Sequence, residues 1–510
     1  MRMLRTSFRN YAVKPVLIPM PCRLSTSSIV AFEQCAKRAW LMTHRREAAE
    51  IAPDAGARLA TNQAVRELAY SQIVGAVRIQ PDPTFSTTPL AVTHALLARG
   101  PDAPVIGAQF EHRGVEVCVD LLEPHKAGWQ IVEVKSSTKA KPEHEAALAT
   151  KLWVARGAGV AITAVSIRHI DRAFVLDQPR DHVGLFADVD LTSRLFGAVA
   201  NRETIAAAAQ EAMGGPEPDV SMGNHCMKPF ACAFATYCEK DHPTGPEWPV
   251  TLLPRGAGKR FLAEGIEDLT LIDPAALSSD MHRRIHRATV TGVTDHDHIG
   301  AAAAMAPWAY PRIWLDFETV SDAIPIWRGC TPYDQVPFQF VADVETADGA
   351  IERRDFLALD GADPRRSCAE ALVALPNEGA VIAWNASFEC AVIRRLAASF
   401  PDLAPALQNL ADRVVDLLPV TRDHWYHRDQ RGSWSIKAVL PTIAPHLDYG
   451  ALEVKDGGNA VEAYREAVAD HCPAERRAAL ASALRLYCGR DVEAMRVVAA
   501  KLVQIDVHPA

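Results

Sequence analysis

Residues 312–320, RIWLDFETV, combine an apolar run with two carboxylates, Asp316 and Glu318, that stand two positions apart. Because side chains alternate along a β-strand, a strand over this stretch would project both acids from one face. Two like charges held side by side cost free energy unless a cation lies between them. The stretch is therefore either a solvated strand edge or half of a metal site.

The flanking sequence predicts an α/β (α+β) domain over residues 306–510. Further apolar strands are predicted around PFQFVADVE (337–345) and GAVIAWN (379–385), and long helices rich in Ala, Leu and Arg follow. Strands that give way to helices in this order are typical of a sheet covered by helices.

Later residues could complete a metal site with this carboxylate pair. Glu389, in NASFE, falls in the first turn of a predicted helix. Tyr487 and Asp491, in YCGRD, stand four positions apart on an amphipathic helix and therefore share one face. Asp416 follows another apolar segment and competes with Glu389 for the place of the third ligand.

These motifs, in this order, resemble the DnaQ-like exonucleases with a DEDD-Tyr signature, and the resemblance implies a ribonuclease H-like fold. In that family two divalent ions, Mg²⁺ or Mn²⁺, activate water and stabilise the leaving oxygen. The implied ligands are Asp316, Glu318, Glu389 and Asp491, and Tyr487 would position the attacking water. The family usually has Asp where this chain has Glu389. The implied activity is 3′–5′ exonuclease digestion of single-stranded DNA or RNA.

A helix start is predicted in GSWSIKAVLP (432–441), ahead of the last motif. Ser433, Ser435 and Lys437 could contact a phosphate there, helped by the helix N-terminus. A simple helix cap is the alternative reading of the same residues.

The first half of the chain carries a second constellation. Asp120 ends one apolar strand, and Glu133 and Lys135 share a face of the next strand, IVEVK. Two carboxylates that hold a divalent ion, with a Lys beside them, suit metal-dependent hydrolysis of phosphodiesters. Taken alone, this pattern also fits many exposed hairpins.

Four of the eleven cysteines have a spacing that suggests a metal cluster. Cys226, Cys232 and Cys238 are separated by five residues each, and Cys35 lies far upstream. Zinc knuckles use tighter pairs, so the spacing favours a [4Fe–4S] cluster over zinc. Cysteines in a long chain without a secretion signal indicate a reducing compartment, and we expect a cytoplasmic protein.

An upstream cysteine and a downstream triplet around a D…ExK core resemble the iron–sulfur nucleases of the PD-(D/E)XK superfamily, which include the RecB/AddB-type nuclease domains. The resemblance covers residues 22–240 and implies a restriction-endonuclease-like core in which the cluster acts as a staple. Two features depart from the family. Ala60 and Ala64 stand where a metal-binding helix usually has His and Glu, and the Gln…Tyr helix is replaced by one that offers Thr150, Lys151 and Trp153. The alternative to an active nuclease is therefore a nucleic-acid-binding or scaffold protein with a decayed first site.

Three regions are expected: residues 22–240, a helical connector over 241–305, and residues 306–510. The iron–sulfur nuclease-like half, together with LDFETV, PFQF, SIKAVLP and YCGRD, resembles the bacterial domain of unknown function 2779 family.

Composition sets further bounds. Hydrophobic residues at 49% and charged residues at 23% are typical of a soluble globular protein, and no membrane span is expected. The net charge of −8 still allows a local basic groove for nucleic acid. The first 46 residues contain one acid, Glu33, and nine basic residues, Arg2, Arg5, Arg9, Lys14, Arg23, Lys37, Arg38, Arg45 and Arg46. A helix start at Ser27 or Ser28 favours a basic binding surface over a transit peptide.

Overall fold

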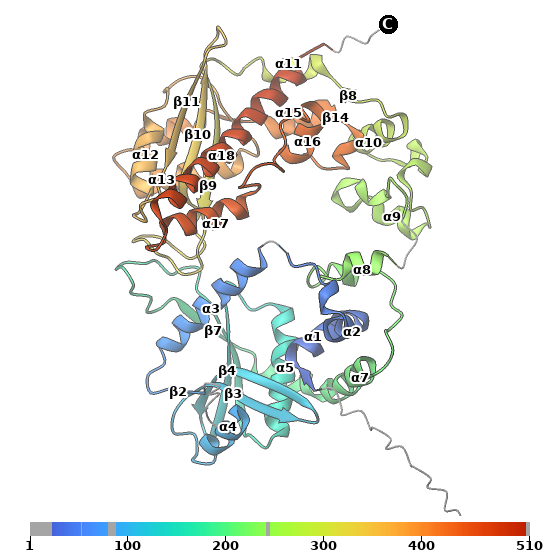
Figure 1. Ribbon diagram of the computed structural model, residues 1–510, viewed down its shortest axis with the longest axis vertical. Helices are drawn as coiled ribbons and strands as arrows, with labels where there is room; N and C mark the ends of the chain where they lie inside the picture. Colours follow the sequence, from blue (N-terminus) through green and yellow to red (C-terminus); the bar gives the residue numbers. More distant parts are fainter. Residues whose placement is uncertain (1–22, 53, 80–87, 241–244, 506–510) are drawn as a thin grey trace, which may run out of the picture. The chain divides into compact units, whose positions relative to one another are not determined.

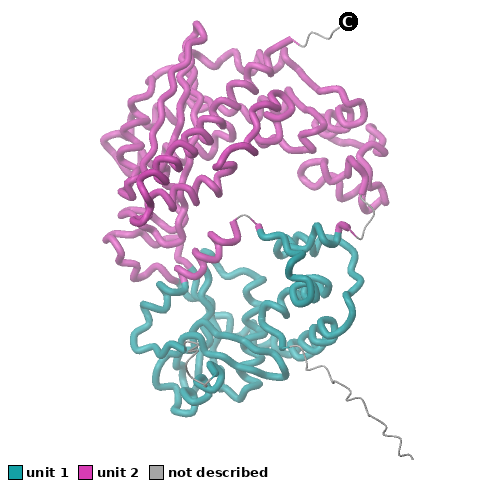
Figure 2. The backbone as a smooth tube through the Cα atoms, in the orientation of Figure 1, with its two compact units in different colours: residues 1–51, 66–169, 187–238 teal, residues 52–65, 170–186, 239–510 magenta. Residues whose placement is uncertain are grey.

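The structure is a computed structural model that describes residues 23–52, 54–79, 88–240 and 245–505. Four residues of the predicted basic surface, Arg2, Arg5, Arg9 and Lys14, lie outside the described residues. The chain folds into two compact units (Figure 2). The first is formed by the described residues of segments 1–51, 66–169 and 187–238, and the second by those of 52–65, 170–186 and 239–510. Each unit combines helices with a β-sheet, so the fold class is α/β.

The first unit is built on a seven-stranded mixed sheet of order β2-β3-β4-β5-β6-β7, with β1 paired to β4. Strands β3, β4 and β5 form an antiparallel meander, whereas β5 and β6 are parallel. The strands are β1 Leu24–Ser25, β2 Val77–Arg78, β3 Val105–His112, β4 Val115–His125, β5 Gly128–Lys135, β6 Ile162–Ile170 and β7 Phe186–Asp190.

Helix α5, Pro142–Gly157, is the central helix of this unit and packs on β3, β4 and α1. Eight consecutive residues, 148–155, are buried, so this helix is enclosed on every side of that stretch. Lys151 lies among them, and a buried ammonium requires an ionic or hydrogen-bonding partner. The other helices are α1 Thr26–Gln34, α2 Ala36–His44, α4 Pro89–Leu97, α6 Thr192–Ala198, α7 Arg202–Gly214 and α8 Ala235–Glu239. Helix α3, Ala55–Ser71, is divided between the units, and its residues from 66 onward belong to the first unit.

The second unit contains a five-stranded sheet of order β11-β10-β9-β12-β13. The strands are β9 Arg312–Val320, β10 Val336–Glu345, β11 Ile351–Leu357, β12 Val381–Ala383 and β13 Val414–Asp416. β9 is antiparallel to β10 and parallel to β12, and β12 is parallel to β13. Helices cover both faces of the sheet, which explains why β10 is buried at every position except Glu345.

Alternation along β9 decides where its acids point. Ile313, Leu315 and Phe317 enter a core formed with α12 Arg365–Val373, α13 Ser387–Ser399 and α14 Ala404–Asp412. Trp314 and Val320 enter a second core on the opposite face. Helices α17 Gly457–Val468 and α18 Ala474–Leu502 pack on β9 at this face (Figure 1). Helices α15 Leu417–His424 and α16 Ile436–Ile443 pack against α18 and belong to the same core. Asp316 and Glu318 therefore point toward the face that carries α18.

Residues 250–308 share that second core and do not form a core of their own. Ile285 and Trp308, for example, pack in the same cluster as Trp314 and Tyr487. The segment contains α9 Gly258–Ala263, α10 Asp280–Thr291 and α11 His298–Met305, and its strand β8 Asp295–His296 pairs with β14 Trp425–Tyr426. Short 3₁₀ helices lie at Arg46–Ala48, Val199–Asn201, Asn224–Cys226, Val250–Leu252, Pro254–Gly256, Leu269–Leu271, Pro274–Ala276 and Arg428–Gln430. Within the described segments, the chain contains no helix with the length and apolar character needed to span a membrane.

Candidate functional sites

Four carboxylates of the second unit form what we call the acidic cluster, because three of them act electrostatically on the fourth: Glu318, Glu389 and Asp491 act on Asp316. The strand β9 supplies the first two, the first turn of α13 supplies Glu389, and α18 supplies Asp491. Glu318, Glu389 and Asp491 are buried, with 7%, 3% and 9% of their surfaces exposed. The thiol of Cys488, one turn before Asp491, lies 3.5 Å from Asp316 Oδ2.

Burial and mutual repulsion oppose ionisation throughout the cluster. Burial raises the pKa of Asp316 well above its ordinary value, and the charges of Asp491, Glu318 and Glu389 raise it further. Burial, followed by the charge of Asp491, raises the pKa of Glu318 to about 8. Burial also raises the pKa of Asp491, although hydrogen bonds from two tyrosines and the charge of Lys437 oppose this shift.

The cluster has few donors for its carboxylate oxygens. Tyr449 Oη donates to Asp491 Oδ1 at 2.5 Å. Glu389 Oε2 is buried and has no hydrogen-bond partner within the described part of the chain. Burial raises the pKa of Glu389 to about 8, helped by the charge of Asp416. A buried oxygen without a donor, among four acids, marks a place where a bound cation would lower the free energy.

Two of the four acids and one thiol are close enough together to hold one ion. Asp316, Glu318 and Cys488 each place one atom within 4.8 Å of the others. Neither Cys488 nor Tyr449 belongs to the site predicted from the sequence. The signal for Cys488 is its place next to Tyr487 in YCGRD, whereas Tyr449 lies in a loop with no motif around it.

Asp416, the competitor of Glu389, has other bonds to satisfy. Its Oδ1 accepts from the backbone N–H of Leu418 at 3.0 Å, which caps α15. The same oxygen accepts from the backbone N–H of Asn385 at 3.0 Å. Glu389, and not Asp416, is among the charges that act on Asp316. The charge of Glu389 therefore acts on Asp316, whereas Asp416 caps α15 and accepts a backbone bond from Asn385.

Tyr487 and Lys437 border the acidic cluster. Lys437 Nζ donates to Tyr487 Oη at 3.1 Å and lies 4.9 Å from the Tyr487 ring centroid. It also donates to the carbonyl of Lys455 at 2.8 Å. Burial and the charges of Asp491 and Glu318 raise the pKa of Tyr487 far above neutrality, so its phenol stays protonated. Ser433 and Ser435 are joined by a hydrogen bond, in which Ser433 Oγ accepts from the backbone N–H of Ser435 at 3.2 Å.

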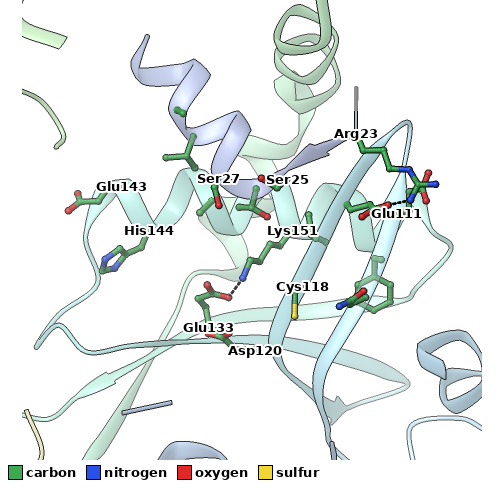
Figure 3. A pocket seen from close by; sticks show the side chains of 18 of the residues that line it. Arg23, Ser25, Ser27, Glu111, Cys118, Asp120, Glu133, Glu143, His144 and Lys151 are labelled. Atoms are coloured by element: carbon green, nitrogen blue, oxygen red, sulfur yellow. Dashed lines mark hydrogen bonds and ion pairs between the residues drawn. The ribbon is translucent and has the colours of Figure 1, made fainter. Parts of the chain in front are cut away.

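The second candidate site, in the first unit, is the hairpin site formed by Asp120, Glu133, Lys135 and Lys151. Asp120 on β4 and Glu133 on β5 are 7% and 5% exposed. Lys135 Nζ donates to Glu133 Oε1 at 2.9 Å, and Lys151 Nζ donates to Glu133 Oε2 at 2.6 Å. Figure 3 shows the Lys151 side chain reaching from its helix to the Glu133 carboxylate.

Asp120 is also surrounded by donors. The backbone N–H of Val134 donates to Asp120 Oδ2 at 3.0 Å, and Tyr70 Oη donates to Oδ1 at 3.3 Å. Arg66 lies 3.9 Å from Oδ1. Burial and the charge of Glu133 raise the pKa of Asp120.

Glu133 itself shows the opposite shift. Burial would raise its pKa, but the charges and hydrogen bonds of Lys151 and Lys135 outweigh burial and hold the pKa at about 2. Burial lowers the pKa of Lys151, but Glu133 and Asp120 raise it above its ordinary value overall. The hairpin site is therefore an ion-paired site, with a charged Glu133 between two ammonium groups.

The hairpin site lines a cavity of about 940 Å³ (Figure 3). Basic residues on its wall include Arg23, Arg38 and Arg66, and acidic ones include Glu111 and Glu143. Thr150 and Trp153 are buried on α5 beside Lys151. Ala60 and Ala64, exposed on α3, offer no ligand atom.

The four predicted cluster cysteines are brought together in the first unit. Cys35, at the junction of α1 and α2, lines a small pocket with Cys226, Cys232 and Cys238. The backbone N–H of Cys232 donates to the carbonyl of Cys226 at 2.8 Å, which closes the loop between them. All four are free thiols, and burial raises the pKa of Cys232 and of Cys238.

One family model matches part of the second unit. Residues 313–435 match the family described as Domain of unknown function (DUF2779), which supports a relation of this segment to that family. The segment runs from β9 to the start of α16 and contains Asp316, Glu318, Glu389 and Asp416, but neither Tyr487 nor Asp491. No curated protein matches the chain.

Proposed function

We propose that the second unit is a metal-dependent nuclease, a 3′–5′ exonuclease of ribonuclease H-like, DnaQ type that acts on single-stranded DNA or RNA. The observation that carries the proposal is the acidic cluster, in which Asp316, Glu318, Glu389 and Asp491 meet with few compensating donors. Groups this costly to bury are concentrated at functional sites.

The residues present fit Mg²⁺ or Mn²⁺. Carboxylate oxygens are the preferred ligands of these ions, and one oxygen of Glu389 is buried without a hydrogen-bond partner among the described residues. A divalent pair held by the four acids would supply water activation and stabilisation of the leaving oxygen.

The chain's own residues supply orientation and charge. The protonated phenol of Tyr487, one turn from Asp491, can orient the attacking water by a hydrogen bond. Lys437 supplies a positive charge beside Tyr487, where it can bind a substrate phosphate. Burial of Tyr487 and Asp491 keeps bulk water away from these groups.

For the first unit, we propose a PD-(D/E)XK-like core with a [4Fe–4S] cluster held by Cys35, Cys226, Cys232 and Cys238. The donor set fits, because four free thiols line one pocket with apolar neighbours such as Leu41 and Phe234. The cluster would join the α1–α2 junction to the end of the unit.

The test is Mn²⁺-dependent digestion of a 5′-labelled single-stranded oligonucleotide by the full-length protein. We expect a ladder that shortens from the 3′ end, and a phosphorothioate at the 3′ terminus should block it. Asp316→Asn should reduce the rate by at least about 10³-fold, since it removes a ligand of the reaction centre. Asp348→Asn, in the exposed β10–β11 turn, is the matched control and should digest normally. Absence of digestion of DNA and RNA with either metal ion would overturn the proposal.

A further inference from the structure

We infer that the hairpin site of the first unit binds no divalent ion, because Lys151 supplies its cation. The inference concerns Asp120, Glu133 and the two lysines alone and does not depend on the activity proposed for the second unit.

Protein donors already engage every carboxylate oxygen of the hairpin site. Glu133 Oε1 and Oε2 accept from Lys135 and Lys151 at 2.9 and 2.6 Å. Asp120 Oδ1 and Oδ2 accept from Tyr70 and Val134 at 3.3 and 3.0 Å. Each of the four oxygens therefore already has a protein donor on one of its lone pairs, and these donors compete with a metal ion for the negative charge.

Lys151 is also held in place. Its side chain is 9% exposed, compared with 26% for Lys135. It belongs to the buried stretch of α5, so its ammonium is more shielded from water than that of Lys135. A lysine on the surface could instead swing into water when an ion arrived.

The charge balance separates the two candidate sites. In the hairpin site, two acids face three cationic groups, Lys135, Lys151 and Arg66. In the acidic cluster, Lys437 is the cation that acts on Glu318 and Asp491, and an oxygen of Glu389 has no donor in the described part of the chain. The same kind of residue is therefore compensated by protein in one site and left uncompensated in the other.

Repulsion sets the size of the effect. An ion bound to Glu133 Oε2 at about 2.1 Å would lie within about 5 Å of Lys151 Nζ, given the 2.6 Å contact. At an effective dielectric constant of about 20, this repulsion weakens the binding of a divalent ion on the order of 10⁵-fold. Removal of the Lys151 charge should therefore strengthen Mn²⁺ binding at this site by at least about 100-fold.

The experiment counts bound Mn²⁺ by electron paramagnetic resonance in the full-length protein. The background variant, Asp316→Asn with Asp491→Asn, removes ligands of the acidic cluster. In this background we expect no Mn²⁺ whose binding depends on Asp120. Adding Lys151→Gln should create one Mn²⁺ site, and a further Asp120→Asn should abolish it.

Two controls isolate the charge of Lys151. Lys151→Arg keeps the positive charge and should leave the site without Mn²⁺. Lys141→Gln removes a lysine charge that is 44% exposed and 4.0 Å from Glu143, and it should also create no site.

One result that would overturn the inference can be obtained with Lys151 unchanged. If the background variant binds Mn²⁺ and Asp120→Asn removes that ion, the hairpin site is a metal site. A Lys151→Gln protein with a native circular dichroism spectrum and no new Mn²⁺ site would equally overturn the role of Lys151. The readout is ion binding, so a failure of nuclease activity in the second unit would be seen separately.

Discussion

Replacement of Glu389 by Gln should stabilise the metal-free protein at alkaline pH and not at acidic pH. The pKa of Glu389 is raised from 4.5 to about 8 by burial, so the folded state holds its proton more tightly than the unfolded state. Between pH 4.5 and 8 the folded state binds more protons, and the free energy of unfolding falls as the pH rises. The slope is about 1.4 kcal/mol per pH unit for one fully engaged group.

From pH 5 to pH 8, Glu389 alone should therefore lower the stability of the second unit by about 3 kcal/mol. Gln has nearly the same shape and no charge, so the variant lacks this loss. Any cost of burying the amide is the same at both pH values and cancels in the difference. With about 2 °C per kcal/mol for a unit of this size, the variant should gain roughly 6 °C relative to the unsubstituted protein as the pH rises from about 5 to about 8.

Thermal unfolding after removal of divalent ions by EDTA measures this difference at the two pH values. Glu378→Gln, at an exposed position before β12, is the matched control and should show no pH-dependent gain. Mn²⁺ added at pH 8 should raise the melting temperature of the unsubstituted protein much more than that of the Glu389 variant. If Glu389→Gln gives the same change at pH 5 and pH 8, the carboxylate is not penalised by burial and the reasoning about the acidic cluster fails.

Three further outcomes are expected. Asp416→Ala should lower the free energy of unfolding, measured by chemical denaturation, by about 1 kcal/mol, because it removes the cap of α15. The affinity for Mn²⁺ should stay unchanged. Loss of Mn²⁺ binding would instead identify Asp416 as a metal ligand. After anaerobic purification, the Cys35→Ser protein should lack the brown colour and the bound iron. The Cys118→Ser control should keep both. Stoichiometric zinc in a colourless unsubstituted protein would contradict the iron–sulfur assignment. Lys437→Met should weaken oligonucleotide binding about tenfold and lower the slope of log affinity against log salt by about 1, as expected for one lost phosphate contact. An unchanged salt slope would mean that Lys437 contacts only the neighbouring tyrosine rings and no phosphate.

Local spacing explains which parts of the acidic cluster could be predicted. Alternation in β9 requires Asp316 and Glu318 to share a face, and helical periodicity requires the same of Tyr487 and Asp491. Glu389 occupies the first turn of its helix, as its sequence indicated.

Contacts that depend on packing could not be read in this way. The bond from Tyr449 to Asp491 spans 42 residues, and nothing local to either residue specifies it. The partner of Lys151 depends on where α5 lies against the sheet, which the helix sequence does not encode. The core that residues 250–308 share with β9 and α18 likewise depends on long-range packing. The local sequence of this segment shows only Pro residues and short helices, and therefore predicted a connector.

The contact between Cys488 and Asp316 joins residues 172 positions apart, and it links the first strand of the sheet to the last helix of the chain. During synthesis β9 leaves the ribosome long before α18. The carboxylates of β9 therefore lack their partner residues on α18 until the end of the chain has been made. Contacts of such large sequence separation form late and slowly in folding. An ion bound by all four acids would therefore require β9, α13 and α18 to have come together. Metal uptake would then report the folding of the second unit.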